Sequence, residues 1–296
     1  MWLPYDDIEV PDGVVADLYD GSEDPPDSIG EVEFYVVPYM TGAADKELMA
    51  RMPRLRVAQT LTAGVDAYLP YVPDGVTLCN ARGVHDASTA ELAVLLTVAA
   101  LRGLPEFVRA QSAGRWEPQR YRSLADQTVL VVGYGSIGAA IERRLLPFEC
   151  GVLKVARTAR EGVAPISDVA DLLPLADVVI LILPMTDETV GLVDTGFLAR
   201  MRDGALLVNV ARGPVVDTDA LLAEVSSGRL RAALDVTDPE PLPPGHPLWT
   251  TPGVLLTPHV GGDSSAFLPR AKALVADQLA RYVEGRDLRN IVTDTY

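Results

Sequence analysis

The stretch "QTVLVVGYGSIGAAIERRLLPF", residues 127–148, decides the fold. Its first part, residues 128–132, is a continuous apolar run, as expected for a strand buried in a parallel sheet. Gly133, Gly135 and Gly138 follow in the spacing G-x-G-x-x-G, and a helical pattern opens within them. The spacing alone is weak, but between a buried strand and a helix it predicts a dinucleotide-binding turn.

Each glycine of this turn has an expected task. Gly133 permits a tight turn, Gly135 lets the backbone approach a pyrophosphate, and Gly138 lets helix and strand pack closely. The helix that begins here presents unpaired N–H groups and a partial positive charge to the phosphates. The alternative interpretation is a glycine-rich turn that holds no ligand.

The second expected strand, residues 151–156, predicts the choice of cofactor. Arg157 and Thr158 follow it directly, with Arg160 close behind. NAD-binding folds usually place an acid about 20 residues beyond the turn, where it binds the ribose 2′-hydroxyl. No acid stands at that point, and arginine attracts a 2′-phosphate. We predict that NADP(H) is preferred and that NAD(H) is possible; the alternative is a pair of solvated arginines.

The rest of the chain alternates short strands with helices, which implies parallel sheets with crossover helices. A largely apolar helix starts near Ser88 or Thr89, either of which can cap it. We predict an α/β protein of two doubly wound parallel-sheet domains with a cleft between them. A flavodoxin-like substrate domain spans residues 1–87 and is completed by 267–296, and a Rossmann cofactor domain spans 88–266. The further strands are expected at residues 32–38, 55–61, 76–80, 177–184, 205–211, 231–236 and 253–258.

Composition narrows the choice of partners and compartment. The chain has 296 residues and a net charge of −16, which disfavours nucleic acid and anionic membranes as partners. The N-terminus lacks a basic region followed by an apolar core, and no apolar stretch is long enough to span a bilayer. We therefore expect a cytoplasmic protein, with Cys79 and Cys150 as buried free thiols rather than a disulfide. No metal-ligand spacing is found.

Polar residues stand at or just beyond the ends of three downstream strands. Arg212 lies in "VNVARGPVVD", Asp235 and Glu240 lie in "LDVTDPEPLP", and His259 lies in "LLTPHVGG". In doubly wound sheets, ligands bind at the carboxyl ends of the strands. We therefore expect these side chains to meet beside the nucleotide.

Arginine, glutamate and histidine suit the reduction of a carbonyl group. Arg212 can bind a carboxylate and its neighbouring oxo group as a fork. His259 can give a proton to the carbonyl oxygen as hydride arrives at carbon, and Glu240 on the other ring nitrogen can hold the tautomer. Each residue alone also fits a structural role. Of the other histidines, His246 is expected to be structural, whereas His85 could border the cleft.

At these residues the chain resembles the D-isomer-specific 2-hydroxyacid dehydrogenases. The segments "TAGVD", "GYGSIG", "LPMTDETVGLVD", "LLVNVARGPVVD", "ALDVTDPEPLP" and "LLTPHVGG" come in that family's order. The arginine after the second strand is most similar to the NADP-using glyoxylate and hydroxypyruvate reductases. The resemblance implies reduction of a small 2-oxo acid to a D-2-hydroxy acid, with Arg212 binding the substrate, His259 as acid and base, and Glu240 supporting it.

The resemblance also implies further site residues and an assembly. Gly64 and Val65 would offer backbone N–H groups to the substrate carboxylate, and the helix from Thr89 onward would form a homodimer. The implied cofactor-binding residues beyond the glycines and Arg157 are Ser136 and Ile137 under the pyrophosphate, Thr158 beside the 2′-phosphate, Thr189 and Val210 in the pocket wall, and Asp235 facing the nicotinamide amide. Two alternatives stay open: a nucleotide-sensing corepressor, and a dehydrogenase of the phosphite type.

Overall fold

The computed structural model describes residues 1–293. The chain divides into two compact units: residues 1–85 together with the described residues from 265 onward, and residues 86–264. The boundaries predicted at residues 87 and 266 lie close to these two divisions. The assignment of substrate to one unit and cofactor to the other stays a prediction at this point.

The first unit is built on a parallel sheet of five strands in the order β2-β1-β3-β4-β5. This is the flavodoxin-like strand order, as predicted. The sequence did not indicate β1 and β2, because two residues each are too few to leave a periodic signal. The strands are β1 Trp2–Leu3, β2 Asp17–Leu18, β3 Phe34–Val36, β4 Val57–Gln59 and β5 Thr77–Cys79.

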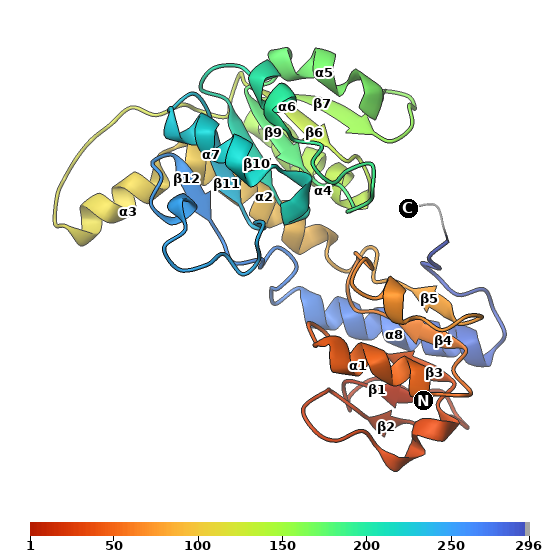
Figure 1. Cartoon of the computed structure of the whole chain (residues 1–296). Helices are drawn as coiled ribbons and strands as arrows, with labels where there is room; N and C mark the ends of the chain where they lie inside the picture. The colour runs from red at the N-terminus through yellow and green to blue at the C-terminus, as the bar shows by residue number, and fades with distance from the viewer. Residues whose placement is uncertain (294–296) are drawn as a thin grey trace. The chain divides into compact units, whose positions relative to one another are not determined.

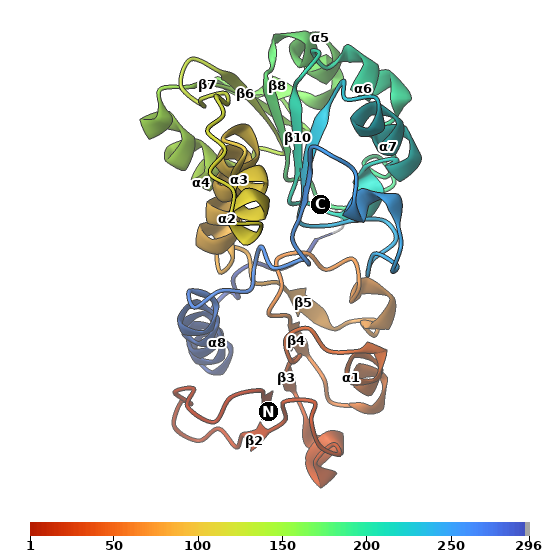
Figure 2. The ribbon, with the colours of Figure 1, turned by 90° about the vertical axis from the view of Figure 1, so that its left-hand side faces the viewer.

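Helices cover both faces of this sheet (Figure 2). Phe34 and Val36 of β3 pack in the same cluster as Phe267 and Val275 of the last helix, α8 (Phe267–Val283). The intervening Tyr35 points to the opposite cluster, on the side of α1 (Ala43–Glu47) and the 3-10 turn η2 (Leu48–Arg51). This alternation along β3 is what a strand buried on both faces requires.

The second unit holds a parallel sheet of seven strands in the order β12-β11-β10-β9-β6-β7-β8 (Figure 1). The order reverses between β6 and β9, which is the switch point where doubly wound sheets bind ligands. The predicted ranges of β6 and β7 match the structure. The strands are β6 Thr128–Val132, β7 Gly151–Ala156, β8 Ala164–Pro165, β9 Val178–Leu181, β10 Leu206–Asn209, β11 Arg231–Leu234 and β12 Val254–Leu256.

The strands of this sheet are apolar on both faces because helices cover both (Figure 2). Val129 and Val131 of β6 belong to the cluster on the side of α2 and α4, whereas Leu130 and Val132 belong to the opposite cluster. The helices of this unit are α2 Asp86–Leu101, α3 Leu104–Ser112, α4 Ser136–Leu145, α5 Val169–Leu172, α6 Thr195–Arg200 and α7 Thr218–Ser226. The remaining 3-10 turns of the chain are η1 Asp27–Glu31, η3 Leu69–Tyr71, η4 Leu146–Phe148, η5 Ile166–Asp168, η6 Leu173–Leu175, η7 Gly213–Val215 and η8 Pro247–Trp249.

The start of α2 corrects the sequence prediction. The helix begins at Asp86, so Ser88 and Thr89 lie inside its first turn and are buried rather than capping it. Their hydroxyls bond to the loop after β12 instead: Ser88 Oγ lies 2.6 Å from Ser264 Oγ, and Thr89 Oγ1 donates to the Gly261 carbonyl at 3.2 Å. Buried hydroxyls need partners, and this loop supplies them.

Two further expectations concern the membrane and the thiols. Among residues 1–293 no single helix is long and apolar enough to cross a bilayer; α2 and α3, bent by 68° at their break, meet the length and composition only as a pair. Cys79 and Cys150 are both buried free thiols, as predicted. Burial raises the pKa of the Cys79 thiol to about 11.

Candidate active site

The glycine turn after β6 has a different reason for glycine at each position. At Gly133 φ is +106°, and a Cβ would lie 2.1 Å from the Ile182 carbonyl oxygen. A Cβ at Gly138 would lie 2.5 Å from the Gly133 carbonyl oxygen, whereas one at Gly135 would meet nothing within 4 Å. Packing therefore requires glycine at positions 133 and 138, whereas the backbone of Gly135 faces open space.

The helix that starts at this turn fits a phosphate group. Gly135 is the N-cap of α4, no side chain caps the helix, and Ser136 and Ile137 form its first turn. The first N–H groups of an uncapped helix have no intrahelical partner. Ser136 Oγ donates to Asp86 Oδ1 at 3.1 Å, which ties this turn to the start of α2. The open space and the uncapped helix end suit a pyrophosphate.

The two arginines beyond β7 are in different situations. The Arg160 guanidinium donates to the Tyr134 carbonyl and stands 5.5 Å from the centre of the Tyr134 ring. Arg157 and Thr158 are exposed. The Arg157 side chain makes no hydrogen bond or ion pair with any residue among 1–293. Arg160 is thus bound to the glycine turn, whereas the Arg157 guanidinium has no hydrogen-bond or ion-pair partner among the described residues.

The loops after β9 and β10 are held by side-chain bonds to the backbone. Thr189 Oγ1 donates to the Pro184 carbonyl at 2.7 Å and accepts from the Thr186 N–H at 2.8 Å. Val210, directly after β10, is buried. The predicted pocket residues Thr189 and Val210 thus lie in the loops at the carboxyl edge of the sheet.

Arg212 follows β10 in a loop that Asn209 organises. Asn209 Nδ2 donates to the Arg212 carbonyl and its Oδ1 accepts from the Ala211 N–H, both at 3.0 Å. Arg212 itself is half-buried, and its Nη1 donates to the Ala211 carbonyl at 2.8 Å. A Cβ at Gly213 would lie 1.9 Å from the Thr237 carbonyl oxygen, so only glycine lets this loop pack against the loop after β11.

Asp235 anchors the loop that carries His259. Its side chain is buried at 3% exposure. Oδ1 accepts from Thr257 Oγ1 at 2.6 Å and from the Val260 N–H at 3.0 Å, and Oδ2 accepts from the Gly261 N–H at 2.8 Å. Sequence reasoning missed this role, because it depends on backbone groups that meet only in the fold. Contact of Asp235 with a nicotinamide amide stays a prediction.

His259 and Glu240 form the closest polar pair of the predicted set. Nδ1 of His259 lies 2.5 Å from Oε1 of Glu240, and both side chains are a little over one-third exposed. A carboxylate accepts from Nδ1–H, which leaves Nε2 as the nitrogen that exchanges a proton. No residue among 1–293 bonds to Nε2. His259 adopts a left-handed φ of +54°, and cis peptide bonds precede Pro239 and Pro241 on either side of Glu240.

The "TAGVD" segment lies in the first unit, after β4. Thr62 Oγ1 donates to the Gly64 carbonyl at 2.7 Å, and Val65 is fully buried. The Gly64 N–H makes no hydrogen bond with a described residue. This donor can therefore serve a ligand carboxylate.

The remaining histidines have structural surroundings. His85 is buried in the first unit, its Nε2 lies 2.8 Å from the Leu61 carbonyl oxygen, and its ring stacks on Phe267 at 5.2 Å. Nδ1 of His246 accepts from the Leu248 N–H at 3.3 Å and caps η8, as predicted for a structural residue. In the described part of the chain no group of three His, Cys, Asp or Glu could hold a metal ion.

The first unit contains a cavity of about 400 Å³. It lies beside β1 and β2, and none of the predicted site residues lines it. Its walls include Asp12, Asp17, Glu31 and Glu33. We place the candidate active site at the carboxyl edge of the second sheet, because the chemistry of the residues there is specific and that of the cavity is not.

Comparison with known proteins supports the fold described above. The fold and the glycine turn define a dinucleotide-binding protein of the Rossmann type. The family model for the D-isomer specific 2-hydroxyacid dehydrogenase NAD-binding domain matches residues 94–261. The chain belongs to the D-isomer-specific 2-hydroxyacid dehydrogenase family. It is an NAD(P)-dependent oxidoreductase by that membership, and its relatives support 2-hydroxyacid dehydrogenase activity.

Three relatives illustrate the similarity. The mouse glyoxylate reductase/hydroxypyruvate reductase is 35% identical over 263 residues, which cover 83% of this chain and 80% of that protein. The structure of a D-isomer specific 2-hydroxyacid dehydrogenase from Xanthobacter autotrophicus, in complex with NADPH and MES, has a TM-score of 0.81 and 32% identity, covering 95% of this chain and 90% of the other. The NADPH-dependent glyoxylate/hydroxypyruvate reductase of Sinorhizobium meliloti, in complex with NADP and sulfate, has a TM-score of 0.78 and 28% identity, covering 88% and 84%.

Proposed function

We propose that this protein reduces a small 2-oxo acid, of the size of glyoxylate or hydroxypyruvate, to the corresponding D-configured or achiral 2-hydroxy acid, with NADPH preferred over NADH. The observation that supports it most is the 2.5 Å contact between His259 Nδ1 and Glu240 Oε1 in the loops after β12 and β11. These strands share the sheet whose glycine turn fits the pyrophosphate. The names of the mouse and Sinorhizobium relatives support this class of substrate.

The proposed mechanism gives each residue one task. Arg212 binds the carboxylate and the oxo group as a bidentate fork, which orients and polarises the carbonyl. A reduced nicotinamide cofactor, held at the glycine turn, would supply the hydride for the carbonyl carbon. His259 donates the proton from Nε2 to the carbonyl oxygen, and Glu240 holds the ring orientation and compensates the charge of the imidazolium. In the reverse direction His259 Nε2 accepts the proton of the hydroxyl group.

The backbone N–H groups of Gly64 and Val65 are proposed to bind the substrate carboxylate. The Gly64 N–H makes no hydrogen bond with a described residue, and its carbonyl is engaged by Thr62. Hydrogen bonds from backbone N–H groups to an ionised carboxylate are shorter and stronger than bonds between neutral groups.

The cofactor preference is proposed from Arg157. Its guanidinium is exposed and no acid stands at the end of β7, so a 2′-phosphate meets a positive charge and a 2′-hydroxyl finds no carboxylate. The Xanthobacter structure, which contains NADPH, supports this choice. The glycine turn, Ser136, Ile137, Thr158, Thr189, Val210 and Asp235 complete the proposed cofactor site.

A homodimer in the cytoplasm is proposed as the working form. Apolar side chains on and after α2 and α3 are exposed, including Leu95 at 55% and Trp116 at 96%. A second copy of the chain would cover such a surface, and two-fold dimers are the commonest assemblies.

The test is a turnover assay of glyoxylate, hydroxypyruvate, pyruvate and a bulkier 2-oxo acid, each with NADPH and NADH. We expect the highest kcat/KM with a small acid and NADPH. Absence of turnover with every acid, despite bound NADPH, would remove the dehydrogenase proposal and favour a nucleotide-binding role.

A further inference from the structure

Asn80 links the end of β5 to the "TAGVD" loop. Its Nδ2 donates to the Ala63 carbonyl at 3.0 Å, and its Oδ1 accepts from the Arg82 N–H at 3.0 Å. Both ends of the side-chain amide are therefore engaged in the first unit. Only a group with one donor end and one acceptor end can make both bonds at once.

The bond to Ala63 fixes the direction of the next backbone donor. The carbonyl of Ala63 and the N–H of Gly64 belong to the same peptide plane, which is rigid and trans. Holding that carbonyl on one side therefore aims the Gly64 N–H to the other side. The next plane is held in the same way, because Thr62 Oγ1 donates to the Gly64 carbonyl at 2.7 Å.

Asn80 is itself held by the C-terminal tail. Its N–H donates to the Asn290 carbonyl at 3.0 Å, and its carbonyl accepts from Asn290 Nδ2 at 3.3 Å. Ile291 forms an antiparallel bridge with Cys79, so the tail runs along the free edge of β5.

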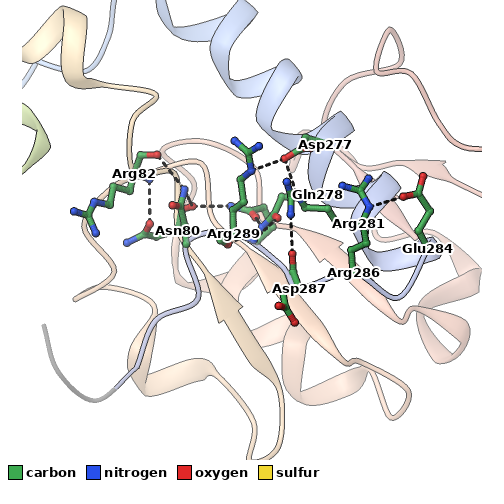
Figure 3. Close-up of polar contacts among 11 residues, drawn as sticks. Asn80, Arg82, Asp277, Gln278, Arg281, Glu284, Arg286, Asp287 and Arg289 are labelled. Carbon is green, nitrogen blue, oxygen red and sulfur yellow. Dashed lines mark hydrogen bonds and ion pairs between the residues drawn. The ribbon is translucent and has the colours of Figure 1, made fainter.

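A buried pair of glutamines also holds the backbone of Asn80, from the interior of the first unit. Gln278 and Gln59 are both fully buried, and Gln278 Nε2 donates to Gln59 Oε1 at 2.8 Å. Gln59 Nε2 in turn donates to the Asn80 carbonyl at 3.1 Å, and the Arg289 N–H donates to Gln278 Oε1 at 2.8 Å. Figure 3 shows Asn80, Gln278 and Arg289 within this network. Such satisfied buried networks rigidify what they touch.

We propose that Asn80 is a positioning residue for the substrate: its side-chain amide holds the Ala63–Gly64 peptide plane and so aims the Gly64 N–H at the carboxylate of the 2-oxo acid. This inference rests on the proposed function, because it uses the binding of a carboxylate by Gly64. Asn80 touches neither substrate nor cofactor in this account. It acts through the loop.

Two variants of Asn80 and one control test the proposal. Asn80→Asp keeps the shape and the acceptor for Arg82 but replaces the donor toward Ala63, and Asn80→Ala removes that donor without adding charge. Arg82→Ala is the control: the Arg82 side chain is exposed and makes no hydrogen bond with a described residue, and the variant keeps the backbone N–H that donates to Asn80 Oδ1. Each is compared with the parent by steady-state kinetics, NADPH titration and amide hydrogen exchange.

We expect both Asn80 variants to raise KM for the 2-oxo acid roughly three- to tenfold, the range that one lost hydrogen bond gives. The carboxylate contact is the same in ground and transition state, so kcat should change little. NADPH affinity should be unchanged, and exchange should rise in residues 62–66. Arg82→Ala should leave the exchange of residues 62–66 as in the parent.

The outcomes separate this inference from the proposed function. Unchanged exchange of residues 62–66 in both Asn80 variants overturns the positioning role whether or not the enzyme turns over. Raised exchange with unchanged KM overturns the link to the carboxylate. A third outcome is possible: the parent protein binds NADPH but reduces no 2-oxo acid, while exchange of residues 62–66 still rises in the Asn80 variants. This result would rule out the proposed function and, with it, the role of Asn80 in substrate binding. It would still support the contact between Asn80 and the loop.

Discussion

Nδ1 of His259 lies 2.5 Å from Oε1 of Glu240, although the two residues are 19 positions apart and follow different strands. Two anchors bring them together. Asp235 fixes the histidine loop through the N–H groups of Val260 and Gly261, and Gly213 lets the preceding loop pack against Thr237. The pair is therefore held by parts of the fold that do no chemistry themselves, which is how precise sites are usually built.

The glycine turn gives a test that separates packing from ligand binding. Gly133→Ala should lower the free energy of unfolding by at least about 1–2 kcal/mol, because φ is +106° and the Cβ would clash with the Ile182 carbonyl. Gly135→Ala should leave the thermal midpoint unchanged, since its Cβ meets nothing, yet weaken NADPH binding. Calorimetry and NADPH titration check both. A Gly135 variant with normal affinity would argue against a pyrophosphate at this position.

The cofactor preference should depend on Arg157 and not on Arg160. Arg157→Ala should reduce kcat/KM for NADPH by roughly 10–100-fold, the worth of one or two charge-assisted bonds, and leave NADH nearly unaffected. Arg160→Ala is the matched control: its guanidinium is bound to the Tyr134 carbonyl, so its loss should affect both cofactors alike. The test is to measure kcat/KM with NADPH and with NADH for the parent and for both variants. A parent protein that already prefers NADH would refute the prediction.

Asp235 should matter to catalysis through the loop it holds. Asp235→Asn keeps the side-chain volume. In the parent, the Val260 and Gly261 N–H groups donate to the carboxylate of Asp235; in the variant, one carboxylate oxygen is replaced by an amide N–H₂, which cannot accept a hydrogen bond. We expect a lower thermal midpoint, faster hydrogen exchange at residues 257–261 and a reduction in kcat of at least about tenfold. The exposed Asp263→Asn serves as the control and should behave as the parent does. Unaltered loop exchange in the Asp235 variant would mean that other contacts hold the histidine.

The ion pair between Asp277 and Arg281, both in α8, predicts that the stability of the fold depends on pH. The hydrogen bond from Arg281 is the main cause that lowers the pKa of Asp277, and Figure 3 shows this pair with Arg289. The pKa of this carboxyl group is therefore lower in the folded chain than in the unfolded chain, where it is near 4. Such a group stabilises the fold at pH values above the unfolded pKa. The stabilisation is lost as the pH falls through the pKa of the folded state. Asp277→Asn should therefore narrow the stability difference between neutral and acid pH. An identical pH dependence in parent and variant would show that the pair contributes nothing.

The architecture could be predicted where the signal is local. The strands β6 and β7 match their predicted ranges, because each is a mainly apolar run; β6 ends at the glycine turn and β7 ends at the charged Arg157. The family and the two-sheet fold are confirmed. The start of α2 was predicted two to three residues too late, since Ser88 and Thr89 satisfy their hydroxyls through tertiary contacts that no local rule reveals.

The site was predictable only in part for the same reason. Arg212, Glu240 and His259 could be singled out because each follows a strand end, where this fold binds ligands. The anchoring role of Asp235, the Asn209 clamp and the Asn80 contact have no sequence signal, because they use backbone groups of distant segments.

The most direct test of the whole account is the single-turnover and steady-state kinetics of His259→Asn, measured beside Glu240→Gln. Positioned general acids contribute about 10²–10⁴-fold, so His259→Asn should lower kcat for 2-oxo acid reduction by that factor while NADPH binds as tightly as in the parent. Glu240→Gln should cost less, because it leaves a partner on Nδ1. A His259→Asn variant with near-normal kcat would contradict the assignment and leave only the nucleotide-binding fold standing.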